Sequence, residues 1–238
     1  RIVSVADREG DMFELFDLRR GHAGPKAELL VRAKTDRCLE DSDRKLFEEL
    51  ALGHRAAKVT IPVPRQRQQT DKPSTPGRPA LAARNAEVEV RFKEVTISAP
   101  QKAQTRHKSP IKVWAIHLVE KNPPEGAAAI DWMLLTSIEV ASVKLALRCV
   151  RWYCRRWRIE EWHRVMKSGC RILEHQHHSA EVLLRAIVLD AVIAWRIMLL
   201  TLLGREMPGL PCDIIFNSVE CEVLELLAQK KDCHSLMP

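Results

Sequence analysis

Four residues that could hold a metal ion against a phosphate share one face of a predicted helix. Tyr153, Arg156, Glu160 and Lys167 stand at offsets of 0, +3, +7 and +14 residues. At about 100° per residue, their side chains fall within a stripe of about 60° around an α-helix. One carboxylate flanked by two cations and a phenol suits that chemistry. By composition alone, the same residues are typical of a solvated helix face that exposed ion pairs stabilise only weakly.

Two runs of the sequence, YCRRWRIEEWHRVMK and IVSVADREGD, contain candidate catalytic acids. The first, with its Tyr-x2-Arg-x3-Glu-x6-Lys spacing, resembles the signature box of the DDE transposases of bacterial insertion sequences, of the family-four type. The second resembles the strand that carries the second catalytic aspartate of that family. The resemblance spans roughly residues 1–200, is weakest between 35 and 110, and implies that Asp7 and Glu160 are catalytic. An aspartate at position 7 is also a favoured helix N-cap, which is the structural alternative.

The resemblance implies a particular chemistry for these residues. Cut-and-paste transposases cut and transfer DNA strands with two divalent ions, and carboxylate ligands favour Mg²⁺, with Mn²⁺ as a substitute. We expect Asp7 to bridge the two ions and Glu160 to hold one of them. Tyr153, Arg156 and Lys167 are expected to contact phosphates of the DNA, which positions the duplex without reading its sequence.

Two further residues are candidates for DNA contacts by the same resemblance. Trp132, in the run WMLLTS, lies 21 residues before the box, where family members that cut through a DNA hairpin have a tryptophan that stacks on a flipped base. Arg32 stands where the family has a DNA-contacting arginine. The alternatives are structural roles for both residues. We expect core positions for the other tryptophans near the box, Trp152, Trp157 and Trp162.

The first of the family's three acids has no counterpart in this sequence. That aspartate lies on a strand well before the second one, whereas six residues precede Asp7 here. A two-metal site without one bridging carboxylate binds its ions poorly, so we expect a transposase fragment, truncated at the N-terminus and inactive by itself. The alternative is a catalytically dead remnant that binds DNA or inhibits the intact transposase.

The positive charge of the chain is concentrated in one stretch. The formal net charge is +7; residues 65–112 contain 11 Lys and Arg against 4 Asp and Glu, and the remainder contains 27 of each. Such a stretch indicates contact with a polyanion, although a basic linker without a partner has the same composition. With the resemblance, the expected partners are double-stranded DNA, as transposon ends and as target, and a second copy in a homodimeric synaptic complex.

The cysteines and the hydropathy indicate a soluble protein in a reducing compartment. There are seven cysteines and no Cys-x-x-Cys pair, which is typical of a cytoplasmic protein. The family resemblance implies that this is the bacterial cytoplasm, at the nucleoid. The spacing of Cys170, His175, His177 and His178 matches no usual zinc site. The apolar run 182–203 contains three charged residues, which favours a buried helix over a membrane span.

The predicted elements are a sheet with a helix, then a β-rich region, then helices. Strands are expected at residues 2–6, 28–34 and 58–63, the last at a sheet edge because of Pro62, and further antiparallel strands at about 88–97, 111–115 and 132–135. A helix is expected between the first two strands. From about Glu139 the chain is predicted to be helical, with breaks near Tyr153, 168–169 and 204–211.

These elements divide the chain into four predicted parts. They are the start of the catalytic core (1–34), a basic β-rich insertion (35–130), the rest of the core with the box helix (131–203) and a helical tail (204–238). The predicted fold class is α/β. The resemblance makes the core a partial ribonuclease-H-like one, with the β-rich insertion and a helical C-terminal part.

Overall fold

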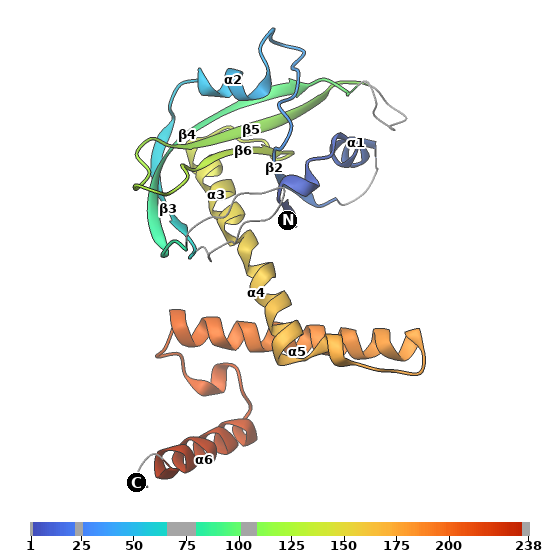
Figure 1. Cartoon of the computed structure of the whole chain (residues 1–238), viewed down its shortest axis with the longest axis vertical. Coiled ribbons are helices and arrows are strands. Elements are labelled where there is room, and N and C mark those ends of the chain that lie inside the picture. The colour runs from blue at the N-terminus through green and yellow to red at the C-terminus, as the bar shows by residue number, and fades with distance from the viewer. Residues whose placement is uncertain (1, 22–25, 66–79, 101–108, 235–238) are drawn as a thin grey trace. The chain divides into compact units, whose positions relative to one another are not determined.

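The computed structural model describes residues 2–21, 26–65, 80–100 and 109–234 of the chain. It divides into two compact units, Arg1–Arg156 and Trp157–Pro238, and each is described by itself. In Figure 1 the strands belong to the first unit, and the described part of the second unit consists of helices and their connections.

The first unit is built on one six-stranded sheet with the order β1-β2-β6-β5-β4-β3. Strands β1 and β2 are parallel and are joined through helix α1, as a parallel pair requires, whereas the other neighbouring pairs are antiparallel. The elements are β1 (Val3–Ala6), α1 (Phe13–Gly21), β2 (Glu28–Arg32), α2 (Leu46–Ala51), β3 (Ala57–Val63), β4 (Arg84–Ile97), β5 (Ile111–Glu120), β6 (Asp131–Thr136) and α3 (Val143–Cys154).

The alternation of apolar and polar residues fixes the register of the long strands. In β4, Val88 and Val90 are fully buried, whereas Glu87 is exposed. A slip of one residue would turn this apolar face to water, so the pairing of Val90 with Leu118 of β5 is strongly specified. Strand β3 lies at the outer edge of the sheet, which confirms the edge position that Pro62 predicted.

Helices cover both faces of the sheet. One core contains Phe13 and Phe16 of α1 together with Leu46 and Leu50 of α2. A second core contains the buried residues of α3 against the opposite sheet face. Figure 1 shows α2 and α3 on opposite sides of the strands. This mixed α/β architecture confirms the predicted fold class and is consistent with a partial ribonuclease-H-like core.

Strands β3, β4 and β5, which come from the predicted insertion, belong to the same sheet as β1 and β2. Strand β6 makes the connection, because it pairs with β2 on one side and with β5 on the other. The buried Thr136 hydroxyl at the end of β6 donates a hydrogen bond to the Leu29 carbonyl at 2.6 Å. The β-rich region therefore extends the sheet that carries Asp7.

The second unit is helical. Its elements are α4 (Arg158–Arg164), the π-helical segment η3 (Val165–Gly169), the 3₁₀ turn η4 (Ile172–Glu174), α5 (Ala180–Glu206), the 3₁₀ turn η5 (Cys212–Ile214) and α6 (Ser218–His234). The 3₁₀ turn η2 (Arg155–Trp157) directly follows α3. The predicted helix breaks near Tyr153, at 168–169 and at 204–211 are thus confirmed.

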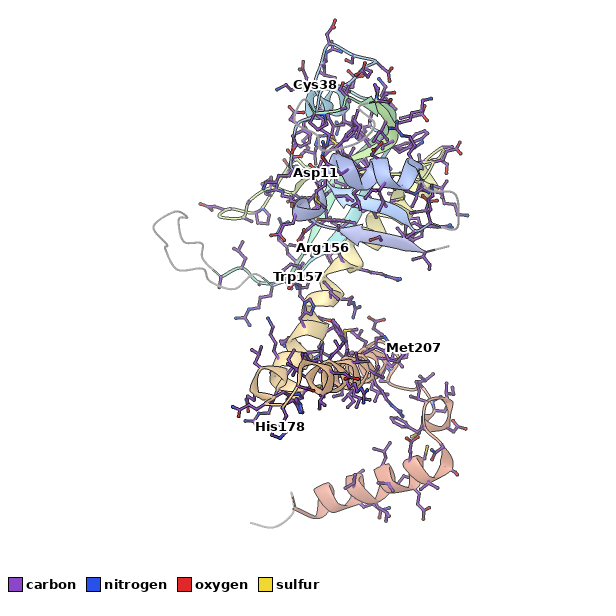
Figure 2. All side chains as sticks on the ribbon, turned by 90° about the vertical axis from the view of Figure 1, so that its right-hand side faces the viewer. Asp11, Cys38, Arg156, Trp157, His178 and Met207 are labelled. Carbon is purple, nitrogen blue, oxygen red and sulfur yellow. The ribbon has the colours of Figure 1, made fainter. Side chains whose placement is uncertain are left out.

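Helix α5 departs from the sequence-based expectation. We expected a buried helix, but Ala194 is its only buried residue and side chains such as Leu189 are 66% exposed. The expectation was wrong because apolar residues lie around the whole circumference of α5, while the contacts of α4 and η3 cover one side, as in the 3.0 Å hydrogen bond from Trp162 Nε1 to the Ala191 carbonyl. By length and composition α5 could cross a membrane, which for a single helix is weak evidence. Figure 2 labels His178 and Met207, just outside its two ends.

Candidate functional site

Asp7 lies at the carboxyl end of β1 and begins the 3₁₀ turn η1 (Arg8–Gly10). Its Oδ1 accepts a hydrogen bond from the Glu9 backbone N–H at 3.0 Å, so the N-cap role that was the structural alternative is present. Its Oδ2 lies 3.5 Å from Nη1 of Arg156, and the Asp7 side chain is 43% exposed against 16% for Arg156. One oxygen of the carboxylate therefore holds the turn, and the other faces a cation of the signature box.

The turn after Asp7 is fixed by two residues that sequence reasoning did not assign. A Cβ added to Gly10 would lie 2.5 Å from Cβ of Ala6, so only glycine fits against the strand there. The side chain of Asp11, which is labelled in Figure 2, is fully buried and accepts hydrogen bonds from the backbone N–H groups of Lys34 and Thr35 at 2.7 and 2.9 Å. Its Oδ1 is 2.6 Å from Nη2 of Arg37. The last acid of the DREGD run thus ties η1 to the chain that leaves β2.

Three of the predicted DNA-contacting residues, far apart in the sequence, meet beside this edge of the sheet. The Arg32 guanidinium lies 5.4 Å from the ring centroid of Trp132. The Trp132 and Tyr153 rings are edge-to-face, with centroids 5.2 Å apart and planes at 68°. Arg32 ends β2, Trp132 is in β6 and Tyr153 is near the end of α3, so the pairing of β2 with β6 and the packing of α3 on the sheet bring them together.

The cluster holds a cation in a partly dehydrated place. Burial lowers the pKa of Arg32, and the charge of Arg8 acts in the same direction, whereas Tyr153 and Asp131 raise this pKa. Arginine stays protonated at any ordinary pH, so the consequence is a guanidinium that has lost part of its hydration. Such a group gains more from a new anionic partner than a fully solvated one does.

Glu160 and Lys167 belong to the second unit, Glu160 in α4 and Lys167 in η3, and both are exposed. The 60° stripe assumed an uninterrupted α-helix, and the backbone is interrupted twice, at η2 and at η3. A 3₁₀ turn advances about 120° per residue, so the even spacing of the stripe is lost at Arg156. Trp157, which we expected in the core, is 50% exposed, because it lies in the turn between α3 and α4 rather than on the face of a packed helix.

A comparison with protein families decides what these features belong to. A family model described as the transposase DDE domain matches residues 12–195. The chain belongs to this transposase family. The match includes Arg32, Trp132 and the whole run from Tyr153 to Lys167, and it begins five residues after Asp7. Membership implies a transposase activity on DNA, and the family generally uses divalent metal ions.

The oxygen ligands of the transposase domain fit such ions in kind. Carboxylates are the preferred ligands of Mg²⁺, and the Asp7 side chain is accessible at the sheet edge. In the described parts of the chain, however, no three side chains of Asp, Glu, His or Cys lie close enough together to hold a metal ion. The described residues of each unit therefore provide accessible carboxylates but no complete cage.

The basic middle stretch contributes less to the described surface than its composition suggested. Of its 11 cations, 6 lie at 67, 72, 78, 102, 106 and 108, outside the described residues. Four of the other five are paired with carboxylates: Arg84, Arg91, Lys93 and Lys112. In the described residues, these four cations are thus paired with carboxylates of a neighbouring strand, of the same strand or of α2, and the predicted polyanion surface falls mainly outside them.

Proposed function

We propose that this transposase domain cuts and joins DNA strands in the cut-and-paste transposition of a bacterial insertion sequence of the family-four type. One observation supports this most directly. Asp7, the candidate second acid, lies 3.5 Å from Arg156 of the signature box, although 149 positions separate them in the sequence. The strand motif that ends at Asp7 and the start of the signature box, which resemble separate parts of the family, therefore meet at one sheet edge, within one unit.

The residues of the site divide the work. Arg156 forks onto a phosphate of the bound DNA, which releases Oδ2 of Asp7 for a metal ion. Asp7 and Glu160 hold Mg²⁺, or Mn²⁺ in its place. When bound, the ions supply a nucleophilic oxygen at neutral pH and relieve the charge on the leaving oxygen. Lys167, after Glu160 in the sequence, orients the DNA backbone. Tyr153, before Glu160, is only 6% exposed and acts on the DNA by way of Trp132, whose ring it contacts edge-to-face.

Trp132 provides a surface for a displaced base. Its indole is partly exposed, with Arg32 at one contact and Tyr153 at another. Stacking of a base on an aromatic ring is worth ~1–3 kcal/mol, and a cation close to the indole strengthens the hold on an adjacent phosphate. We propose that Trp132 receives a base flipped out of the transposon end and that Arg32 contacts the neighbouring backbone.

Two copies act together on two transposon ends and on the target DNA. The broad exposed apolar surface of α5 supports this, because monomeric proteins rarely leave such a surface uncovered. We place the homodimer in the cytoplasm, at the nucleoid. In the domain organisation, we propose residues 1–34 and 131–203 as the catalytic core, 35–130 as the insertion and 204–238 as a tail.

A non-catalytic role in DNA binding or inhibition is the second candidate. The observation that favours it is the lack of a three-ligand cluster among the described residues. A transposase domain that binds transposon ends without cutting them would occupy those ends against an active copy. The two candidates differ in strand cleavage and agree in DNA binding.

Strand cleavage of transposon-end DNA in Mg²⁺, by the chain completed with a segment that supplies the family's first aspartate, tests the proposal. The binding of the same DNA is measured separately. Glu160→Gln is expected to abolish cleavage and to leave binding intact. Glu161→Gln is the matched control, because Glu161 is the next residue of α4 and pairs with Arg158 instead. Cleavage that survives Glu160→Gln would refute the assignment. A completed chain that binds and does not cut would support the non-catalytic candidate.

A further inference from the structure

We propose that the outer face of α3 is an additional DNA-backbone surface, formed by Lys144, Arg148, Arg151 and Arg155. This α3 cation stripe rests on the proposed action on DNA and adds a substrate contact to it. None of its four residues was among the candidate site residues, and the basic stretch at 65–112 does not include them.

The geometry of the helix makes the four cations one surface. Three of them, Lys144, Arg148 and Arg151, stand in α3 at offsets of 0, +4 and +7, which fall within about 60° around an α-helix, and Arg155 follows at the C-cap. All four are exposed. The buried residues of α3, Ala146, Cys149, Val150 and Tyr153, lie on the opposite side and pack in the core of the sheet. At about 1.5 Å per residue, the stripe extends over roughly 16 Å.

Local helix stability explains only part of this arrangement, because Arg151 in the last turn complements the macrodipole whereas the other features work against the helix. From Val140 to Ile159 the sequence contains six Lys and Arg and no Asp or Glu. The pairs 144/148 and 151/155 place like charges at i,i+4, which destabilises a helix, and Lys144 stands in the first turn, where an acid would complement the macrodipole. A sequence that breaks local rules in one place without a structural gain marks a functional surface.

No carboxylate of the described residues neutralises the charges of the stripe. Among the described residues, none of the four side chains forms an ion pair or a hydrogen bond. The exposed cations of the sheet behave differently: Lys58 lies 3.1 Å from Glu87, and Lys112 lies 3.2 Å from Glu94. On the described surface, these sheet cations are therefore paired with carboxylates, whereas the four cations of the α3 stripe are not.

A nucleic-acid backbone is the partner that this row fits. A phosphodiester strand presents one negative charge per about 3.4 Å of duplex axis, so a 16 Å row meets several phosphates, and arginine binds phosphate with two parallel hydrogen bonds. An anionic membrane surface fits less well, because a membrane-bound helix needs an apolar face for the acyl chains. The apolar face of α3 is already buried against the sheet. Since the stripe ends at Arg155, it leads the DNA to Arg156.

The test is the salt dependence of DNA binding by the full chain. The triple variant Lys144→Gln, Arg148→Gln and Arg151→Gln is titrated onto a labelled duplex of arbitrary sequence. Each lost phosphate contact reduces the slope of log Kobs against log[salt] by about 0.9, so the three reduce it by up to about 2.7. Between 50 and 200 mM salt, the wild type should lose about 40-fold more affinity than the variant.

A charge-matched control comes from the same unit. Arg44→Gln, Lys58→Gln and Lys112→Gln together remove the same formal charge from exposed residues that are paired with carboxylates. This control should keep a slope near that of the wild type. The charge-conserving variant Arg148→Lys and Arg151→Lys keeps the stripe cationic if the glutamine variant does not fold, and it should keep most of the slope as well.

The outcomes separate this inference from the proposed function. A wild-type chain that does not bind duplex DNA would refute the proposed function itself. Binding with equal slopes in the wild type, the stripe variant and the control would overturn the stripe alone. If vesicles that contain phosphatidylserine bind the wild type better than the stripe variant, while DNA binding is the same for both, the stripe serves a membrane surface and the inference is wrong.

Discussion

Asp11→Ala is expected to destabilise the first unit more than any substitution at Asp7. The Asp11 side chain is fully buried, and its removal leaves the Arg37 guanidinium, itself 7% exposed, without its carboxylate. The backbone N–H groups of Lys34 and Thr35 lose their acceptor as well. Removing one partner of a buried ion pair typically costs about 3–5 kcal/mol. For a unit of this size, the loss corresponds to a fall in Tm of roughly 10 °C.

Thermal and urea unfolding, followed by circular dichroism, measure this cost. Arg37→Ala and the double variant complete a cycle, in which the double variant should be less destabilised than the sum of the single ones, because neither charge is then left alone. Asp7→Asn is the contrasting variant. Asparagine caps as well as aspartate, so we expect a change in unfolding free energy within about 0.5 kcal/mol together with a loss of strand cleavage.

One pair of results would show that Asp11 is the catalytic acid and Asp7 is not. A cost below about 1 kcal/mol for Asp11→Ala would show that the buried contacts with Arg37 and the two amides contribute little, against the general rule for buried pairs. If this stable variant also lost cleavage while Asp7→Asn kept it, Asp11 would be the catalytic acid. The assignment of Asp7 would then be refuted.

Three further predictions concern base stacking, pH and metal ions. Trp132→Ala should weaken the trapping of a flipped base about 10-fold or more, with Trp132→Phe retaining part of the stacking, as measured with a fluorescent base analogue in transposon-end DNA. The hydrogen bonds from Arg84 lower the pKa of Glu120 in the folded state, as does the bond from the Ile130 amide. Glu120 therefore stabilises the fold above its unfolded pKa of about 4.3, and this contribution is lost as the pH falls through the lower folded value. The gap in urea stability between the wild type and Glu120→Gln should therefore be constant at neutral pH and narrow as the pH falls below about 4.3. Chelation of divalent ions should abolish strand cleavage and leave phosphate-driven DNA binding in place, and cleavage that persists in EDTA would contradict the metal-dependent reaction.

The strands near Asp7 could be predicted because short β-branched runs leave few alternatives. Strands expected at 2–6 and 28–34 correspond to β1 and β2, and the position of Pro62 placed β3 at an edge. The order of the sheet could not be predicted, because β6 enters between β2 and β5 through contacts distant in sequence. The burial of α5 was predicted wrongly, since an all-round apolar helix shows that some cover is needed but not that the same chain supplies it.

The sequence proposes the members of the candidate site one by one, but it does not predict which of them lie in contact. Arg32, Trp132 and Tyr153 were each chosen by resemblance, and their mutual contact depends on strand register and on the docking of α3. Asp11 was missed, because its partners follow β2 and no local pattern connects them. The α3 cation stripe was missed for a different reason. Outside 65–112 the formal charges of the residues sum to zero. A net charge taken over so many residues does not show that cations recur every three or four residues along one helix.

The contact between Asp7 and Arg156 places a carboxylate and a guanidinium side by side, so that each balances the charge of the other in the absence of a ligand. At 3.5 Å the two groups lie at a long distance for an ion pair, and the Asp7 carboxylate stays open to water at 43% exposure, against 16% for Arg156. Separating the two groups therefore costs little. In the proposed site, a phosphate at Arg156 and a divalent ion at Asp7 would each form a stronger, charge-assisted interaction than the one it replaces. We infer that the pair keeps the sheet edge electrically balanced in the unbound transposase domain and that DNA and metal ions bind more favourably together than either does alone, because each removes the partner of the other.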